Sequence, residues 1–430
     1  MFKTIAMLSI LGTTLCVQSN ALVVVENPVV EWNRNLLQIV RTRGAQPETI
    51  HSTRSFAIMH VAMYDAVNTI HRTHETYIPH RLKTSGNESI DAAAIGAAFQ
   101  VLARLYPSLR AMLETEFERS LARVPQSAEK LQGIRIGREV ADQILANRIN
   151  DGSNAKPSPY VFRPGAGNYE STPPNFPPQP QFTHWSHVTP FVLERASQFR
   201  SAPPPALDSE RYASGLASTE RSGSATGSTA DPDQALTGRF WNGAIQNYWN
   251  EIAQTAAVAH HLNTAETARV FALLNLSVAD SVIAFYDAKY TYNLWRPVSA
   301  IRAADSSIAP NVVANANWLP EVGNTTPDPS YPGAHAVVSA AAAEVLTIFF
   351  DGGWLDFDVR SEVMPGVSRH FTSFSAAAQE AKFSRIFAGV HFPFDLTSGE
   401  TMGLAVADFV VDHALTLRDQ DRYVEPSRVE

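Results

Sequence analysis

The sequence predicts an all-α protein, with two four-helix-bundle-like halves in one compact unit. Apolar residues recur at three- and four-residue spacing along most of its 430 residues, which is the period of an amphipathic helix. A proline-rich segment separates the helical stretches into two groups. One helical stretch of the first group has a residue pattern similar to that of one stretch of the second group. Hydrophobic residues make up 45% of the chain and charged residues 18%, which is typical of globular proteins.

The first 21 residues are typical of an export leader. Lys3 supplies the positive start, residues 5–17 the apolar stretch, and residues 19–21 a small-x-small cleavage site. We therefore expect an exported protein, periplasmic or secreted; the alternative is a buried N-terminal segment. Cys16 lies inside the leader, so the mature chain would have neither a disulfide nor a thiol nucleophile.

Residues 22–150 are expected to form the N-terminal helical bundle. The helical period runs through "VEWNRNLLQIVRTR", "STRSFAIMHVAMYDAVNTIH", "SIDAAAIGAAFQVLARLY", "SLRAMLETEFERSLARV" and "EKLQGIRIGREVADQILANRI". Residues 151–234 are expected to form a crossover and loop, because 12 of the 27 prolines lie between residues 157 and 205. Aromatic residues in this segment indicate that it is ordered, and residues 219–234 are expected to be a surface loop.

Residues 235–430 are expected to form the C-terminal bundle, which carries the functional site. Helical stretches are predicted at 268–295, 334–350, 374–388 and 394–417. "RSFAIMHVAMYDAV" (54–67) aligns without a gap on "RVFALLNLSVADSV" (269–282), with Arg, Phe, Ala, Asp and Val identical. Two amphipathic helices could match by chance, but a duplicated bundle would explain both the match and the proline-rich joint.

The charge of the chain excludes some classes of partner. The formal net charge is −8, so no basic excess exists to bind nucleic acid or an anionic membrane surface. No membrane span is expected, because the apolar part of the leader is too short and Glu344 interrupts the apolar stretch "AHAVVSAAAAEVLTIFF". The sequence contains no HExxH, P-loop or nucleophile-elbow motif.

Two cations stand in the stretch "KYTYNLWRPVSAIR". Lys289 and Arg296 are seven residues apart, a spacing that predicts nearly the same helix face, two turns apart. Pro297 is expected to end that helix, because the residue before a proline avoids helical geometry. The alternative is an exposed charged stripe.

The stretch "DPSYPGAHAVVSAAAAEVL" places a Pro-Gly turn before an apolar helix expected at 335–350. The amides of Gly333, Ala334 and His335 would be unpaired donors there, and helix N-termini bind anions through such donors. The alternative for His335 is a helix cap or a packed side chain.

A third stretch, "SRIFAGVHFPFD", contains a cation, a histidine and a carboxylate. Arg385 lies in the last turn of one predicted helix, and Pro393 suits the first position of the next. Asp395 could accept a hydrogen bond from one ring nitrogen of His391 and leave the other as a basic ligand or nucleophile. The alternative for Asp395 is an acidic residue that favours the helix dipole.

Together the three stretches supply what a tetrahedral oxyanion site needs, namely fixed positive charge, fork-shaped donors, a base and a proton donor. At these residues the sequence resembles the superfamily of vanadium-dependent haloperoxidases and type 2 phosphatidic acid phosphatases, which is marked by K-x6-R-P, P-S-G-H and S-R-x5-H-x3-D. The matching residues are Lys289, Arg296, Pro297, Pro332, His335, Ser384, Arg385, His391 and Asp395. Most of the mature chain is similar to the soluble bacterial haloperoxidase-like branch.

The resemblance implies two four-helix bundles and bound vanadate, with His391 as the single protein ligand to vanadium. Lys289, Arg296 and Arg385 would neutralise the vanadate oxygens, assisted by the amides of Gly333 and Ala334. His335 would take a proton from hydrogen peroxide, and Lys289 would polarise the oxygen that halide attacks, which gives a hypohalous acid.

The same residues could serve a soluble acid phosphatase acting on a phosphate ester. His391 would attack phosphorus, oriented by Asp395, and His335 would protonate the leaving oxygen. The chain also departs from the family, because Gly333-Ala334 stands where the family has Ser-Gly. The lost serine hydroxyl leaves a third alternative, a non-catalytic relative that binds phosphate or vanadate.

Overall fold

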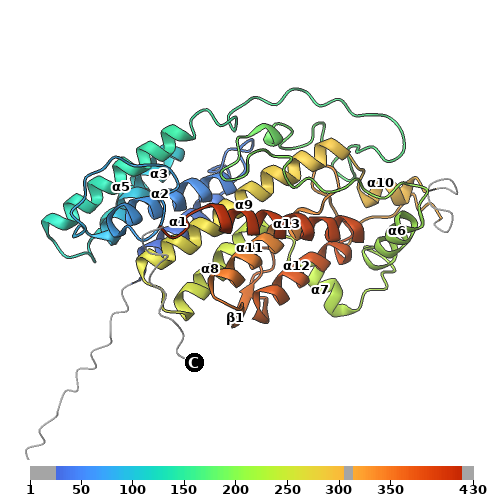
Figure 1. Ribbon diagram of the computed structural model, residues 1–430. Coiled ribbons are helices and arrows are strands. Elements are labelled where there is room, and N and C mark those ends of the chain that lie inside the picture. The colour runs from blue at the N-terminus through green and yellow to red at the C-terminus, as the bar shows by residue number, and fades with distance from the viewer. Residues whose placement is uncertain (1–25, 305–312, 419–430) are drawn as a thin grey trace, which may run out of the picture.

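The computed structural model describes residues 26–304 and 313–418. Its α-helices are α1 (Pro28–Arg41), α2 (Thr53–His71), α3 (Ile90–Leu105), α4 (Arg110–Leu121), α5 (Ala128–Asn147), α6 (Glu210–Ser222), α7 (Pro232–Phe240), α8 (Ile245–Ala259), α9 (Thr264–Tyr292), α10 (Pro297–Arg302), α11 (Ala334–Phe349), α12 (Phe374–Phe387) and α13 (Pro393–His413) (Figure 1). The predicted helical fold is confirmed. The predicted leader, with Cys16, lies outside the described residues.

In the N-terminal half, α2, α3 and α5 pack against one another, and α1 and α4 pack on α3. Two glycines of α5 allow the close contact with α3. A Cβ at Gly137 would lie 2.1 Å from the carbonyl oxygen of Ala93, and one at Gly133 would lie 2.3 Å from that of Ser89. Since real Cβ atoms do not approach a carbonyl so closely, larger residues would push the two helices apart.

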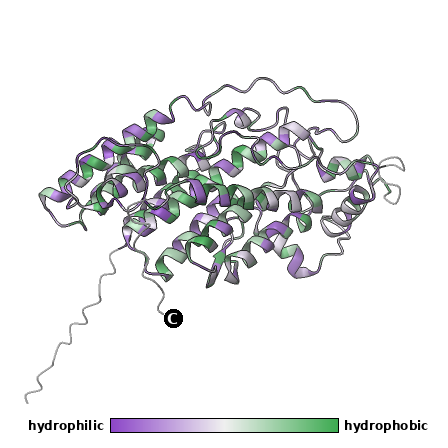
Figure 2. Ribbon diagram, viewed as in Figure 1, coloured by the Kyte–Doolittle hydropathy of each residue, from purple (hydrophilic) through white to green (hydrophobic). Residues whose placement is uncertain are grey.

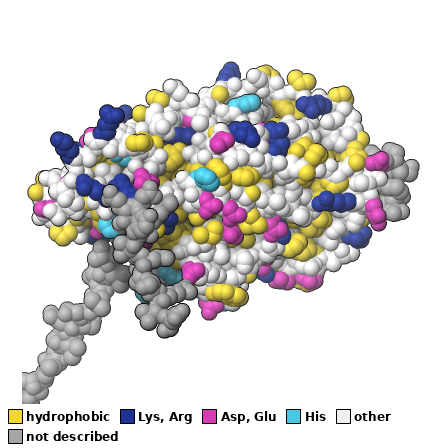
Figure 3. Space-filling model, viewed as in Figure 1, with side chains coloured by type: hydrophobic (Ala, Val, Ile, Leu, Met, Phe, Trp, Pro, Cys, Tyr) yellow, Lys and Arg dark blue, Asp and Glu magenta, His cyan; other side chains and the backbone are white. Residues whose placement is uncertain are grey.

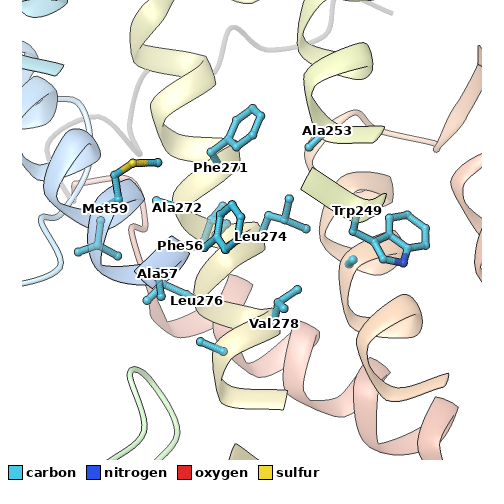
Figure 4. Close-up of a cluster of buried hydrophobic side chains, with 14 of the residues drawn as sticks. Phe56, Ala57, Met59, Trp249, Ala253, Phe271, Ala272, Leu274, Leu276 and Val278 are labelled. Carbon is cyan, nitrogen blue, oxygen red and sulfur yellow. The ribbon is translucent and has the colours of Figure 1, made fainter. Parts of the chain in front are cut away.

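The helix α9 belongs to the core of both halves. It packs on α2 on one side and on α8, α11 and α13 on the other. Figure 4 shows Phe56 and Met59 of α2 and Trp249 of α8 around Phe271 and Leu274 of α9. Among the described residues, α9 is long and apolar enough to cross a membrane, as is the sharply bent pair α3–α4 if it is taken as one span, but 94% of the apolar window of α9 is buried inside the protein.

The two matched sequence stretches lie in α2 and α9, which pack together. In each helix the shared aspartate accepts hydrogen bonds from backbone N–H groups of a loop. Asp65 accepts hydrogen bonds from the backbone N–H groups of Tyr77, at 2.7 Å, and Ile78, at 3.2 Å. Asp280 accepts three, from the N–H groups of residues 191–193 at 2.6 to 2.8 Å. Each carboxylate therefore fixes a loop across the bundle, in agreement with a duplicated helix.

The C-terminal half is built around α11, which packs on α9, α12 and α13. A Cβ at Gly403 of α13 would lie 2.2 Å from the carbonyl oxygen of Val337, so this glycine allows α13 to lie close to α11. An antiparallel hairpin of β1 (Trp354–Arg360) and β2 (Ser368–Ser373) was not predicted. Its signal is the two-residue alternation that buries Phe357 and Val359.

Part of the predicted crossover and loop is helical. The proline-rich residues form an ordered wrap with a short 3-10 turn, η2 (Trp185–His187), but α6 and the start of α7 also lie within 151–234. The prediction of a loop over 219–234 was therefore wrong at both ends. The missed signal is Asp231-Pro232, because Asp231 and Gln234 form a capping box and Pro232 occupies the first turn of α7.

Hydrophobic and hydrophilic residues alternate along the same helices (Figure 2), as expected for amphipathic helices that pack on one side. On the face drawn in Figure 3, acidic and basic side chains are both present.

Candidate functional site

The first two cations converge on one carboxylate. The ammonium of Lys289 is 3.2 Å from Oδ1 of Asp328 and also donates to the carbonyl oxygens of Pro329 and Ser330. Arg296 donates from Nη2 to the same Oδ1 and from Nε to the carbonyl oxygen of Asp328, the latter at 2.8 Å. All three charged side chains are buried.

The predicted common helix face for Lys289 and Arg296 was wrong. The helix α9 ends at Tyr292, because Asn293 adopts the left-handed conformation with φ of 55°. Asparagine tolerates this conformation and commonly ends helices. Arg296 therefore precedes α10 in an extended conformation and reaches the site from the connection between the two helices.

His391 is held by a carboxylate at one nitrogen and faces an arginine with the other. Nδ1 is 3.0 Å from Oδ2 of Asp395, and Nε2 is 3.1 Å from Nη1 of Arg296. The same Asp395 oxygen accepts from the Ser330 hydroxyl at 2.5 Å and from the Phe392 N–H at 3.0 Å. Because an arginine only donates, Nε2 of His391 is the unprotonated nitrogen and Nδ1 carries the proton.

The turn before α11 joins this group, but not as predicted. The N–H of Gly333 donates to the carbonyl oxygen of Asp395 at 3.0 Å, so the expectation that it is free for an anion was wrong. Gly333 caps the helix, which begins at Ala334. The amides of Ala334 and His335 are therefore the first two of the helix, which have no acceptor within it.

His335 is partly buried, and its Nε2 lies 2.8 Å from the carbonyl oxygen of Trp241. That carbonyl can only accept, so Nε2 is protonated and Nδ1 is the basic nitrogen of the neutral ring. The guanidinium of Arg385 is buried, and its two terminal nitrogens each lie 3.3 Å from Oδ1 of Asn242. The Nε of Arg385 is a buried donor without a hydrogen-bond partner.

Burial and the neighbouring cations disfavour the protonated forms of the basic side chains in this site. Burial lowers the pKa of Lys289 to about 8, and burial together with Arg296 lowers the pKa of Arg385 to about 9. Burial and the neighbouring cations also hold the pKa values of His335 and His391 well below the ordinary histidine value. An anion bound among these groups would favour their protonated forms.

The structure thus brings all three predicted stretches to one place. Arg296 links the first to the third through His391, and Gly333 links the second to the third through Asp395. Sequence reasoning missed Asp328, Ser330 and Asn242. Asp328 and Ser330 stand in the stretch that opens the second motif, where the sequence shows only an Asp between two prolines.

Comparison with known proteins gives this arrangement a family. Residues 269–420 match the sequence model of the VCPO second helical-bundle domain. The chain is 23% identical to a vanadium chloroperoxidase from Curvularia inaequalis, over 86% of this chain and 79% of that protein. The crystal structure of a bacterial vanadium-dependent iodoperoxidase matches with a TM-score of 0.75 and 26% identity, over 91% of this chain and 96% of that one. Residues 269–420 thus resemble the second helical bundle of the vanadium haloperoxidases, and the described part of the chain shares their helical fold.

A solved holo-type bacterial vanadium-dependent chloroperoxidase shares the fold, with a TM-score of 0.65 and 17% identity over 89% of this chain and 97% of that one. Gly333-Ala334 departs from the Ser-Gly of the superfamily pattern, and the structure gives a steric reason for the absence of a side chain at residue 333. A Cβ at Gly333 would lie 3.0 Å from Cδ2 of Leu396. The leucine therefore occupies the space next to the position where the family has a serine side chain.

The residues present fit a tetrahedral oxyanion such as vanadate. Arg385 has a buried Nε with no partner, and α11 offers its first amides. His391 offers one unprotonated nitrogen on the side of the cations, as a ligand to vanadium requires. A vanadium haloperoxidase site would therefore use His391 as the metal ligand, with Lys289, Arg296 and Arg385 around the oxygens.

A cavity of about 230 Å³ is lined among others by His51, Phe182 and Ala244. Phe182 follows Gln181, whose Nε2 is 3.4 Å from Oδ2 of Asp328. Ala244 lies two residues after Asn242, the partner of Arg385. Two lining residues therefore lie within two residues along the chain of a group that contacts Asp328 or Arg385.

Proposed function

We propose that the protein is a vanadate-dependent haloperoxidase-like enzyme, which oxidises halide with hydrogen peroxide to hypohalous acid. One observation carries the proposal: Nε2 of His391 is unprotonated and faces Arg296, while Asp395 and Ser330 fix the opposite side of the ring. Similarity to a vanadium chloroperoxidase and a vanadium-dependent iodoperoxidase supports it.

In this proposal vanadate, held noncovalently, supplies a Lewis acid that activates hydrogen peroxide toward halide without a change of oxidation state. His391 binds the vanadium, and the buried carboxylate of Asp395 raises the basicity of the ring. His335 accepts the peroxide proton at Nδ1, because its Nε2–H is engaged by Trp241. Lys289 and the two arginines hold the oxygens of the anion.

A soluble acid phosphatase is the second candidate. The same dyad favours it, because an unprotonated Nε2 oriented by Asp395 is a nucleophile suited to attack on phosphorus. The leaving oxygen, however, needs a proton donor, and the low pKa of His335 favours its neutral form. That form suits a base better than an acid.

One experiment separates these candidates from a relative that only binds the anion. The protein is freed of phosphate and assayed for peroxide-dependent bromination and iodination, and for hydrolysis of p-nitrophenyl phosphate, with and without orthovanadate. We expect halogenation that requires vanadate and disappears in His391→Ala. Hydrolysis inhibited by vanadate, without halogenation, would establish the phosphatase instead. Anion binding without either reaction would establish the non-catalytic relative.

A further inference from the structure

The three site cations are compensated unequally. Lys289 and Arg296 share the carboxylate of Asp328, and the ammonium of Lys289 also contacts two backbone carbonyls. Arg385 pairs only with the neutral amide of Asn242. Among the described residues, no ion pair of Arg385 is formed. Lys289, Arg296 and Asp328 together therefore keep one net positive charge, and Arg385 keeps its full positive charge.

Asp328 is fixed in this place from several sides. It is 3% exposed, and Gln181 contacts its second carboxylate oxygen at 3.4 Å. Its backbone carbonyl also accepts from Nε of Arg296 at 2.8 Å, so the main chain and the side chain bind the same guanidinium. The carboxylate is thus a resident part of the anion site and not a mobile surface charge.

We infer that Asp328 is an internal counter-ion, which acts through Lys289 and Arg296 to set the charge of the oxyanion that the site accepts. The inference rests on the proposed oxyanion site. An anion bound by these cations shares them with Asp328 and is repelled by its carboxylate. Because Coulomb repulsion is proportional to the charge of the anion, Asp328 weakens the binding of a dianion more than that of a monoanion.

The site is thereby tuned toward monoanionic oxyanions, such as doubly protonated vanadate or phosphate. Asp328 is a positioning residue in this scheme, because its side chain contacts the cations that hold the anion. A purely structural role would change the stability of the protein but not the ratio of affinities for two anions of equal shape.

The test compares sulfate, a tetrahedral dianion, with perrhenate, a tetrahedral monoanion, at constant ionic strength and neutral pH. Binding is measured by calorimetry on the full chain without vanadate, and by the anion-induced shift of the unfolding temperature. In Asp328→Asn we expect tighter binding by roughly tenfold for perrhenate and roughly a hundredfold for sulfate, since the removed repulsion doubles with the anion charge. Asp328→Glu keeps the charge and should keep the wild-type ratio.

Glu321→Gln serves as a control. It removes a partly buried carboxylate that pairs with Arg239 and with none of the site cations, so both affinities should stay unchanged. If Asp328→Asn weakens both anions, or changes both equally, the inference is wrong. If the wild type binds neither of these anions, nor phosphate, nor vanadate, the proposed oxyanion site itself is wrong.

A second variant keeps the test decisive if Asp328→Asn does not fold. Asp328→Ser removes the same charge with a smaller polar side chain, so it should also strengthen sulfate binding about tenfold more than perrhenate binding. An unchanged ratio of the two affinities in Asp328→Ser would contradict the counter-ion role of Asp328.

Discussion

Nε2 of His391 lies 3.1 Å from Nη1 of Arg296, while Nδ1 of the same ring lies 3.0 Å from the carboxylate of Asp395. The histidine is therefore bound on one side by a group that only donates and on the other by one that accepts. This fixes one neutral tautomer and aims the lone pair of Nε2 at the cations.

Asp395→Asn should weaken the hydrogen bond that orients this ring. We expect nitrogen NMR of the wild type to show His391 neutral and protonated at Nδ1, and the variant to keep this tautomer, because Arg296 still donates to Nε2, but with a weaker hydrogen bond at Nδ1. Because loss of a partner behind a metal-binding histidine commonly costs about 10- to 100-fold in affinity, vanadate binding should weaken by that factor. Wild-type vanadate affinity in the variant would contradict the role of Asp395.

Ser330→Ala should move the acid limb of vanadate binding to higher pH. Burial raises the pKa of Asp395 to about 6, and the hydrogen bond from Ser330 opposes this rise. Without the hydroxyl the pKa of Asp395 increases further, so the ionised form that holds His391 is lost at a higher pH as the solution is acidified. The affinity is measured across the pH range, with Ser398→Ala as a control, because the Ser398 hydroxyl bonds Tyr331 and not Asp395. An unchanged acid limb would rule out this coupling.

Gly333→Ser tests the departure from the family. The backbone of Gly333, with φ of −76° and ψ of 112°, suits any residue, but the new Cβ meets Leu396 at 3.0 Å. The single substitution should therefore destabilise the protein by about 1–3 kcal/mol, and Leu396→Ala should provide the missing space in the double variant. In the double variant, compared with Leu396→Ala alone, the added hydroxyl should strengthen vanadate binding by about 0.5–1.5 kcal/mol. Calorimetry showing no gain would mean that the hydroxyl does not reach the anion.

The two site histidines should contribute a loss of stability as the pH falls below neutrality. The pKa values of His335 and His391 are well below the ordinary value in the folded state, so the unfolded chain binds more protons below pH about 6.5. The free energy of unfolding therefore decreases as the solution is acidified through that pH. Denaturant titrations at several pH values should show that the free energy of unfolding decreases less on acidification in the double variant His335→Gln/His391→Gln than in the wild type. It should also decrease less in the wild type when phosphate is present. The same acid loss in all three cases would contradict the assignment.

Asp280→Ala should destabilise the fold more than surface substitutions do. It leaves three backbone N–H groups of residues 191–193 without their acceptor, and each unsatisfied buried donor costs about 1–3 kcal/mol. Asp65→Ala removes the acceptor of two such groups and should also lower the free energy of unfolding. Urea unfolding measures both, with Asp358→Ala of the exposed face of β1 as the reference.

The sequence was sufficient for most of the site because its motifs combine residue type with fixed spacing. Arg385, His391 and Asp395 lie on consecutive elements, so their local geometry could be argued from helix ends. Arg296 was expected at the site but on the wrong element, because the left-handed conformation of Asn293 ends α9 one turn earlier than proline would.

Asp328 and Ser330 could not be found in this way. Their partners are 39 and 65 residues away along the chain, and a single buried carboxylate or hydroxyl leaves no periodic signal. The hairpin β1–β2 was missed for a related reason, since its alternation is short and its pairing is a property of two segments together.

The sharing of α9 between the two halves has a consequence for truncated proteins. The helix carries core residues such as Phe271 near its start and Lys289 near its end, and it packs on both α2 and α11. A fragment that begins at residue 264 would keep Lys289, Arg296 and His391 but expose to water the surface that α2 normally covers. The second bundle is therefore not a detachable catalytic module, and limited proteolysis in the first half should abolish anion binding in the second.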